Sequence, residues 1–326
     1  MARSAPAPAV EDVLEALAAT LASTASTSEA LAVVGRAGPT SARLTRALQN
    51  RLRGGTLAAA LTAEQLVSER EAAIVRAGED AARLPAALRW IAAQRRTSRA
   101  RQRAIRGAVV APLALALVTL LTEPLPAVVV GAGSFGPAIV STSLLIAATA
   151  ALLFGGPRLL AHVRVGARIR AAAAAVPLAR GLVRMETEER ASSIVAAFAD
   201  DRALALAPTV ARAVLAPPYV AALTQAATDP FAPITTFSES FGLALVAGAQ
   251  AGDLPARFSR HADAAARVTT GRLVAGARVA AYALVLAVFL HAALRLLAAP
   301  LPGLGGDIGN SPELRELERE IESAGH

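Results

Sequence analysis

Two stretches of ten residues share one pattern at an offset of 170 residues: Ala77-Gly78-Glu79-Asp80-Ala81-Ala82-Arg83-Leu84-Pro85-Ala86 and Ala247-Gly248-Ala249-Gln250-Ala251-Gly252-Asp253-Leu254-Pro255-Ala256. The alanine matches mean little in a chain this rich in alanine. The shared glycine, leucine and proline need no gap, and a polar helix with arginines and then a long apolar run follow each stretch. A repeat of this length indicates that a whole unit is duplicated.

The composition predicts an all-α protein. Hydrophobic residues make up 54% of the 326 residues, much of them alanine, whereas aromatic residues make up only 3%. Alanine favours helices, and the alternating runs that are typical of strands are scarce. The chain has no cysteine, which excludes disulfides and thiolate metal ligands.

The charge distribution indicates a membrane protein. The formal net charge is +8, and every basic residue is an arginine, because the sequence contains no lysine. The arginines gather beside the apolar runs and do not alternate with aromatic residues along one stripe. This arrangement is typical of residues that fix the orientation of a membrane protein, and it disfavours binding to nucleic acid.

A first cytoplasmic helical domain is predicted at 11–106, after a Pro/Ala leader at 1–10. Glu11 and Asp12 follow the leader where a cleaved signal peptide needs an apolar core. The helices expected in this domain are Glu11–Ala22, one that Gly38-Pro39 ends, one from Ser41 with Leu44, Leu48 and Leu52 on one face, and Leu57–Leu61, Glu64–Ala77 and Leu84–Arg106.

Three apolar runs are predicted to be transmembrane helices, at 107–123, 138–160 and 279–299. The first has about 15 apolar residues where roughly 20 are typical, and an extension to Leu125 with Glu123 at a membrane interface would close the gap. A connector rich in Gly and Pro, residues 124–137, joins the first two.

A second cytoplasmic helical domain is predicted at 161–278, with a helix at Glu186–Leu206 and loops around Pro217-Pro218 and Asp229-Pro230. Residues 300–326 form an acidic tail, which is either solvated or a short docking helix that Ser311 would cap. Arginines flank the helical-domain side of each span, and the connector has none. By the positive-inside rule both domains are cytoplasmic, while the connector and tail face the other side. A helical core without a membrane is the alternative.

Nothing in the sequence points to catalysis. The four histidines show no metal-ligand spacing, and a phosphate-binding loop of the Walker type needs a lysine that the chain lacks. Serines in the second span and His291 in the third are compatible with a Ser–His pair, but hydroxyls in spans more often bond to a helix backbone. We therefore expect no catalytic, cofactor-binding or metal-binding residues.

At the repeated stretch the chain resembles the F-domain family of type II secretion systems and type IV pilus machines. The family motif has an apolar residue, Gly-Glu, Gly and then Leu before a helix that enters the membrane. Here the two copies read Val75, Gly78-Glu79, Ala82, Leu84 and Leu245, Gly248-Ala249, Gly252, Leu254. Glu79 is thus present only in the first copy and the second glycine only in the second. The order of domains and spans over 11–297 is also similar.

The resemblance implies a non-enzymatic platform protein of the inner membrane with two duplicated cytoplasmic domains and three transmembrane helices. Its implied partners are a cytoplasmic hexameric ATPase, pilin-like subunits, other membrane components of the machine and further copies of the chain. The alternatives are a membrane scaffold or receptor and a transport subunit, both unrelated to pili. The motif residues that are candidates for partner contacts are Gly78, Glu79, Leu84, Gly248, Gly252 and Leu254.

Two expectations concern the motif residues. Gly78 and Gly248 should mark a helix end or a helix approach too close for a side chain. Glu79 should matter more for assembly with a partner than for stability, since exposed charges contribute only about 0–1 kcal/mol to folding.

The first testable prediction is the topology. Reporter fusions at Gly131 and at the C-terminus should be active outside the cytoplasm, and a fusion near Ala203 should not, because arginines flank only the helical domains. A cytoplasmic tail would contradict the three-span arrangement.

Overall fold

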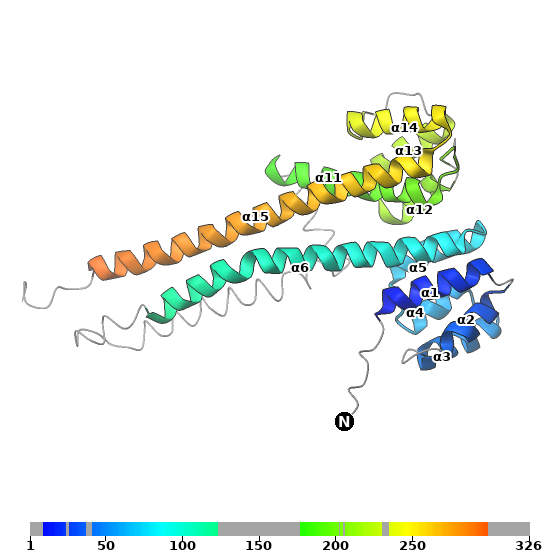
Figure 1. The fold of residues 1–326 in the computed structure, drawn as a ribbon, viewed down its shortest axis with the longest axis horizontal. Helices are drawn as coiled ribbons and strands as arrows, with labels where there is room; N and C mark the ends of the chain where they lie inside the picture. Colours follow the sequence, from blue (N-terminus) through cyan, green and yellow to red (C-terminus); the bar gives the residue numbers. More distant parts are fainter. Residues whose placement is uncertain are drawn as a thin grey trace, which may run out of the picture. The chain divides into compact units, whose positions relative to one another are not determined.

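The computed structural model describes residues 9–23, 26–36, 41–122, 177–201, 203–204, 206–229 and 235–298. Every regular element in these ranges is an α-helix, and none is a strand, which confirms the all-α prediction (Figure 1). The predicted connector, the second span and the acidic tail lie outside the described residues, as does most of the leader.

The helices belong to two compact units. Unit 1 consists of residues 1–104 and 172–273, and unit 2 of residues 105–171 and 274–326. Helices of both predicted cytoplasmic domains lie in unit 1, which we therefore divide into a first half (9–104) and a second half (177–273). Two long helices, α6 (Leu84–Thr122) and α15 (Leu254–Ala298), begin in unit 1 and end in unit 2.

The first half contains α1 (Val10–Ser23), α2 (Thr27–Gly35), α3 (Ser41–Leu52), α4 (Leu57–Ala63), α5 (Glu69–Asp80) and the start of α6. Hydroxyl caps begin three of these helices: Ser26, Thr56 and Ser68 each accept a hydrogen bond from the amide three residues further on. Because Ser68 caps α5, the helix predicted at Glu64–Ala77 begins five residues later, at Glu69.

The second half contains α11 (Pro177–Phe198), α12 (Ala207–Val214), α13 (Pro217–Thr228), α14 (Glu239–Ala251) and the start of α15. The helix predicted at Glu186–Leu206 is part of α11 and ends at Phe198. The loop predicted around Pro217-Pro218 lies just before these prolines, between α12 and α13, and the prolines themselves open α13. Proline suits the first turn of a helix, where its fixed φ is helical and its missing N–H leaves no bond unmade.

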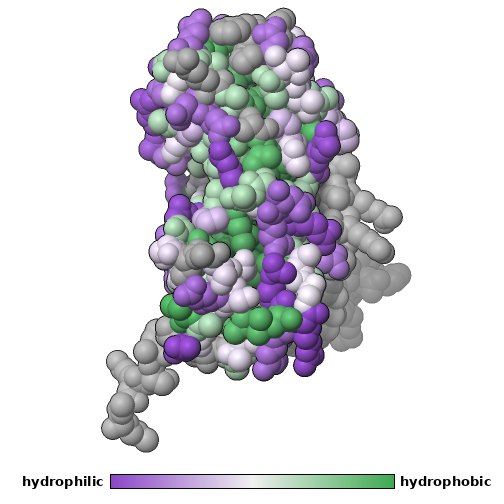
Figure 2. Space-filling model, turned by 90° about the vertical axis from the view of Figure 1, so that its right-hand side faces the viewer, coloured by the Kyte–Doolittle hydropathy of each residue, from purple (hydrophilic) through white to green (hydrophobic). Residues whose placement is uncertain are grey.

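One hydrophobic core runs through both halves of unit 1. Leucines such as Leu14 and Leu61 fill it in the first half. In the second half Phe241 stacks on Phe237, with ring centroids 4.1 Å apart, and meets the edge of Phe258 at 4.9 Å. Aromatic pairs of this kind contribute about 0.5–1.5 kcal/mol beyond the area that they bury. On the face drawn in Figure 2, hydrophobic residues form strips between hydrophilic ones.

In unit 2, Ala116 of α6 packs with Val285 and Val288 of α15. Large apolar side chains around this contact are exposed, such as Val110 at 63% and Leu286 at 70%. Among the described residues, one helix is long and apolar enough to cross a membrane, the stretch Leu254–Leu290 of α15. Only 17% of its most apolar window is buried, which argues against the core helix of a soluble protein.

The helix starts around the repeated stretch keep the offset of 170 residues. In the first half α5 begins at Glu69 and α6 at Leu84, and in the second half α14 begins at Glu239 and α15 at Leu254. The capping serines, Ser68 and Ser238, have the same offset.

The turns between these helices also correspond. Gly252, after α14, has the left-handed φ of 70°, and Ala82, at the corresponding place after α5, has a φ of 55°. The amide of the next residue donates to the carbonyl of Gly78 or Gly248, at 2.8 Å in the first turn and 3.1 Å in the second. Both helices therefore end in a left-handed turn, although only the second has the glycine that this backbone favours.

A reciprocal pair of substitutions tests these turns. Ala82→Gly should raise the free energy of unfolding by about 0.5–1 kcal/mol, because it removes the strain of a left-handed alanine. Gly252→Ala should lower it by about 1 kcal/mol. The measurement is urea unfolding of the detergent-solubilised protein, followed by the fluorescence of Trp90, its single tryptophan. Destabilisation by both substitutions would contradict the correspondence of the turns.

Candidate functional site

The two glycines of the repeated stretch lie where helices approach closely. Gly78 on α5 and Gly248 on α14 are both buried. A Cβ on Gly78 would lie 2.7 Å from the Cβ of Ala87, and a Cβ on Gly248 would lie 2.8 Å from Cδ2 of Leu254. Neither position has room for a side chain, in agreement with the expectation from the sequence.

The other motif residues divide between the same two turns. Leu84 and Leu254 are the first residues of α6 and α15, and both are buried in the core. The amide of Leu254 donates to the carbonyl of Asp201 at 3.1 Å, which ties this turn to the segment after α11. The structure thus brings the six candidate residues together in two sets, one in each half, and not in a single site.

Glu79 has a structural role that the sequence did not reveal. Its carboxylate accepts hydrogen bonds from the amides of Leu57 at 2.8 Å and Ala58 at 3.3 Å, at the start of α4. These amides have no partner inside the helix, and a negative charge there also complements the helix dipole. The expectation that Glu79 contributes little to stability is therefore corrected, and its contact with a partner stays a prediction.

A half-buried ion pair joins α5 to α6. Arg95 donates from Nε to Oε1 of Glu71 at 2.8 Å and from Nη2 to Oε2 at 2.6 Å, and Glu71 also completes a capping box with Ser68. Burial by itself raises the pKa of Glu71, but hydrogen bonds from Arg95 and Ser68 and the charge of Arg95 outweigh it, so this pKa lies below its usual value. Phe241 stands at the corresponding position of the second half, where the aromatic stack replaces the ion pair.

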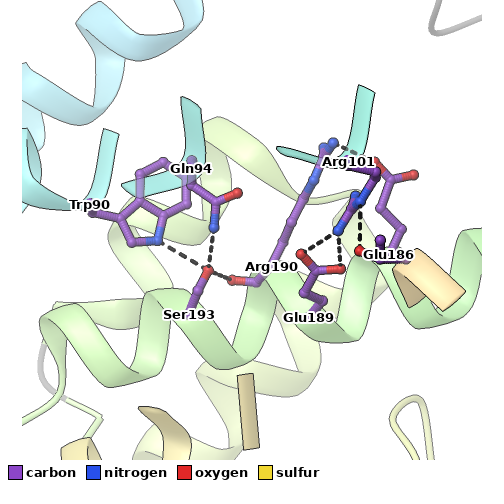
Figure 3. A network of polar contacts seen from close by, with 8 residues as sticks. Trp90, Gln94, Arg101, Glu186, Glu189, Arg190 and Ser193 are labelled. Carbon is purple, nitrogen blue, oxygen red and sulfur yellow. Dashed lines mark hydrogen bonds and ion pairs between the residues drawn. The ribbon is translucent and has the colours of Figure 1, made fainter. Parts of the chain in front are cut away.

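A layer of polar side chains joins α6 to α11 (Figure 3). Ser193 accepts hydrogen bonds from Trp90 Nε1 at 3.1 Å and from Gln94 Nε2 at 3.0 Å. One turn before Ser193 on α11, both carboxylate oxygens of Glu189 lie 2.7 Å from Nη2 of Arg101. The side chains of this pair are only 15% and 5% exposed. We call these five residues the α6–α11 layer.

Two further arginines of the first half reach the second half. Arg70 on α5 donates to the carbonyls of Ala213 and Val214 at the end of α12. Arg83, in the turn before α6, pairs with Asp200, just after α11. The guanidinium group of Arg70 thus satisfies backbone carbonyls at the end of α12, which have no partner inside the helix. The guanidinium group of Arg83 pairs with a carboxylate that follows the end of α11.

A serine, a histidine and a glutamate also meet in the second half. Ser192 Oγ lies 2.9 Å from Nδ1 of His261, and Nε2 of the same ring lies 3.7 Å from Oε1 of Glu188. Ser192 is fully buried, and its hydroxyl donates to the backbone carbonyl of Glu188 at 2.7 Å. A nucleophile needs an accessible hydroxyl, so these contacts serve packing. The side chains of the Ser–His pair considered in the spans are not among those described.

Metal binding has no support in the described part of the chain, which contains no group of three His, Asp or Glu residues suited to a metal ion. The geometry shows structural features instead: two close helix approaches without room for a side chain, at Gly78 and Gly248, and a polar layer that joins the halves of unit 1. Sequence reasoning missed the α6–α11 layer. The available signals were the single tryptophan, Trp90, and the adjacent acids Glu188 and Glu189, which are buried in α11.

Comparison with known families gives one match. Residues 13–130 match the family described as "Type II secretion system (T2SS), protein F". The matched range covers the first half of unit 1 from α1 onward, including the first copy of the repeated stretch, and continues to the end of α6 and beyond. No curated protein matches the chain.

Glu79→Ala should lower the free energy of unfolding by about 1–2 kcal/mol, because it leaves two amides of α4 without acceptors. Asp80→Ala is the matched control: this neighbouring acid is exposed, and its loss should change the free energy by less than about 0.5 kcal/mol. Urea unfolding followed by Trp90 fluorescence measures both. Equal stability of the two variants would mean that the hydrogen bonds of Glu79 contribute nothing.

The lowered pKa of Glu71 predicts a loss of stability in acid. Its stabilising contribution is fully present above the usual pKa of about 4.5 and is lost as the pH falls through the lower value of the folded state. Glu71→Gln should therefore be less stable than the wild type at pH 7, and the difference should shrink below pH 4.5. A difference that grows in acid would contradict this assignment.

Glu189→Gln should lower the free energy of unfolding by about 2–3 kcal/mol, because it leaves the mostly buried charge of Arg101 without a counterion. Glu186→Gln, on the same helix, removes an acid that pairs with Arg190 one turn away and is 29% exposed. Pairs of this kind contribute only about 0.3–0.5 kcal/mol. The two variants carry the same change of charge, so equal losses would contradict the role of burial.

Proposed function

We propose that this chain is the non-enzymatic inner-membrane platform of a type II secretion or type IV pilus-like machine, because its residues 13–130 match the type II secretion system F family. In this proposal it couples a cytoplasmic hexameric ATPase to the assembly of pilin-like subunits. Members of the family are generally membrane platform proteins without enzymatic activity, and the apolar stretch of α15 is consistent with a membrane location.

The family match is the observation that carries the proposal, and the repeated stretch extends it to the rest of the chain. The match covers one F domain, while the helix starts and turns of α14 and α15 keep the offset of 170 residues from those of α5 and α6. We infer that the second half is a second F domain, and that the chain is a multi-pass protein with three spans and a cytoplasmic N-terminus.

A mechanical route from motor to membrane follows from the helix bounds. Each repeated turn begins a single long helix, 39 residues in α6 and 45 in α15, that passes from unit 1 into unit 2 without a break. A helix can transmit a shift along its axis, and Pro112 inside α6 removes one backbone hydrogen bond, so that α6 can also bend there. An ATPase that moves unit 1 would in this way act on the spans, where pilin-like subunits are extracted.

Affinity purification from native membranes tests the proposal. The tagged full-length chain should recover a hexameric ATPase, pilin-like subunits and further copies of itself, identified by mass spectrometry. A multi-pass protein of unrelated family, carrying the same tag in the same cells, is the control. Recovery of neither ATPase nor pilin-like subunits, with receptors or transport proteins in their place, would overturn it in favour of a scaffold or a transport subunit.

A further inference from the structure

We propose that α6 and α15 bind the headgroups of anionic phospholipids through arginines that stand just before their exposed apolar residues. These are Arg103 and Arg106 on α6 and Arg272 and Arg278 on α15. The inference rests on the membrane location in the proposed function and goes beyond it by naming the class of lipid that the protein selects.

The arginines of α6 divide into two sets along the helix. Arg96, Arg99 and Arg101 pair with acids of unit 1. The next two, Arg103 and Arg106, are exposed, and within the described residues they form no ion pair or side-chain hydrogen bond. The fold therefore pairs the arginines from Arg95 to Arg101 and leaves Arg103 and Arg106 for another partner.

The arginines of α15 divide in the same way. Arg257 and Arg260, near its start, pair with Asp253. Further along, Arg267, Arg272 and Arg278 are exposed, and no described residue pairs with any of them; Arg272 and Arg278 lie nearest to the long apolar run. Neither helix has an acidic residue in these parts, since none occurs in 102–122 or in 264–298. The positive charge is therefore not neutralised along either helix.

The spacing places these charges at the level of lipid phosphates. On α6, Val110 is 63% exposed and follows Arg106 by four residues and Arg103 by seven. On α15, exposed Val279 follows Arg278 directly and Arg272 by seven residues. At 1.5 Å per residue these separations are about 6 Å and about 10 Å on α6, and about 1.5 Å and about 10 Å on α15. The headgroup layer is about 5–8 Å thick on each side, and arginine side chains extend along the helix, so apolar side chains in the hydrocarbon put the guanidinium groups among the phosphates.

The chemistry of the four residues favours anionic lipids over zwitterionic ones. A guanidinium group donates two parallel hydrogen bonds to phosphate oxygens, and it stays charged. In a zwitterionic headgroup the choline charge offsets the phosphate, whereas phosphatidylglycerol keeps a net negative charge. The exposed apolar residues on the same helices argue for a lipid surface, because an acidic protein or nucleic acid would not cover them.

Spin-labelled lipids test the inference. The full-length chain is reconstituted in phosphatidylcholine vesicles with a trace of labelled phosphatidylglycerol or labelled phosphatidylcholine. Electron paramagnetic resonance then gives the fraction of each label held at the protein. We expect a preference of about two- to fivefold for phosphatidylglycerol, within the roughly fivefold that a single surface charge contributes. The variant R103Q/R106Q/R272Q/R278Q should bind both labels equally.

A control variant removes the same charge elsewhere. It replaces four exposed arginines of unit 1 that have no ion pair among the described residues, Arg36, Arg53, Arg76 and Arg212, with glutamine. This variant should keep the wild-type preference. The double variants R103Q/R106Q and R272Q/R278Q should each lose part of it, and unchanged unfolding by Trp90 fluorescence shows that they remain folded.

Equal binding of both labels by the wild type would overturn the inference. An acidic protein surface would then be the better candidate for the partner of these arginines. An equal loss in the control variant would also overturn it, since the effect would then belong to net charge. If lipid preference is absent while the ATPase still co-purifies, the inference fails and the proposed function stands. If the preference is present but the ATPase is not recovered, the proposed function fails alone.

Discussion

The close approach of α5 and α6 at Gly78 is the constraint on which most of the first half depends. A Cβ on residue 78 would collide with Ala87. Because glycine has no Cβ, α6 can lie close to α5, and the chain reverses within a few residues and buries Leu84 at the start of α6. The residues on either side of this turn then reach further. Glu79 holds the start of α4, and Arg83 pairs with Asp200 of the second half. A side chain at position 78 would therefore disturb the positions of several helices at once.

Local signals in the sequence are sufficient for several helices of the first half and for the start of α6. Ser41–Leu52 and the start of α6 at Leu84 agree with the structure, since apolar spacing and the Gly and Pro breaks determine them within a few residues. The errors arose where one residue type suits two structures. The sequence predicts a loop around Pro217-Pro218, whereas Pro217 opens α13. Proline is favourable both in turns and in the first helical turn, so its presence alone does not distinguish the two.

The α6–α11 layer could not be predicted in the same way, because its partners lie far apart in the chain. Trp90 and Ser193 are separated by 103 residues, and Arg101 and Glu189 by 88. No periodicity links such positions, and only the folded core brings them together. In these contacts the first half supplies the donors and the second half the acceptors. The two halves of unit 1 therefore present complementary faces to each other, with donors on the first and acceptors on the second.

The same division of roles changes how the net charge of +8 is to be read. A strongly basic chain ordinarily suggests a polyanionic partner. Here Arg70, Arg83 and Arg101 bind carbonyls and carboxylates of another part of the chain, inside unit 1. An arginine is suited to this task because its several donors satisfy two acceptors at once, which a lysine does less well. Arg103, Arg106, Arg272 and Arg278 have no ion pair within the described residues, and they precede exposed apolar residues of α6 and α15. The net charge therefore overestimates the positive charge that is available to bind a polyanion. The position of an arginine along its helix indicates better what that arginine binds.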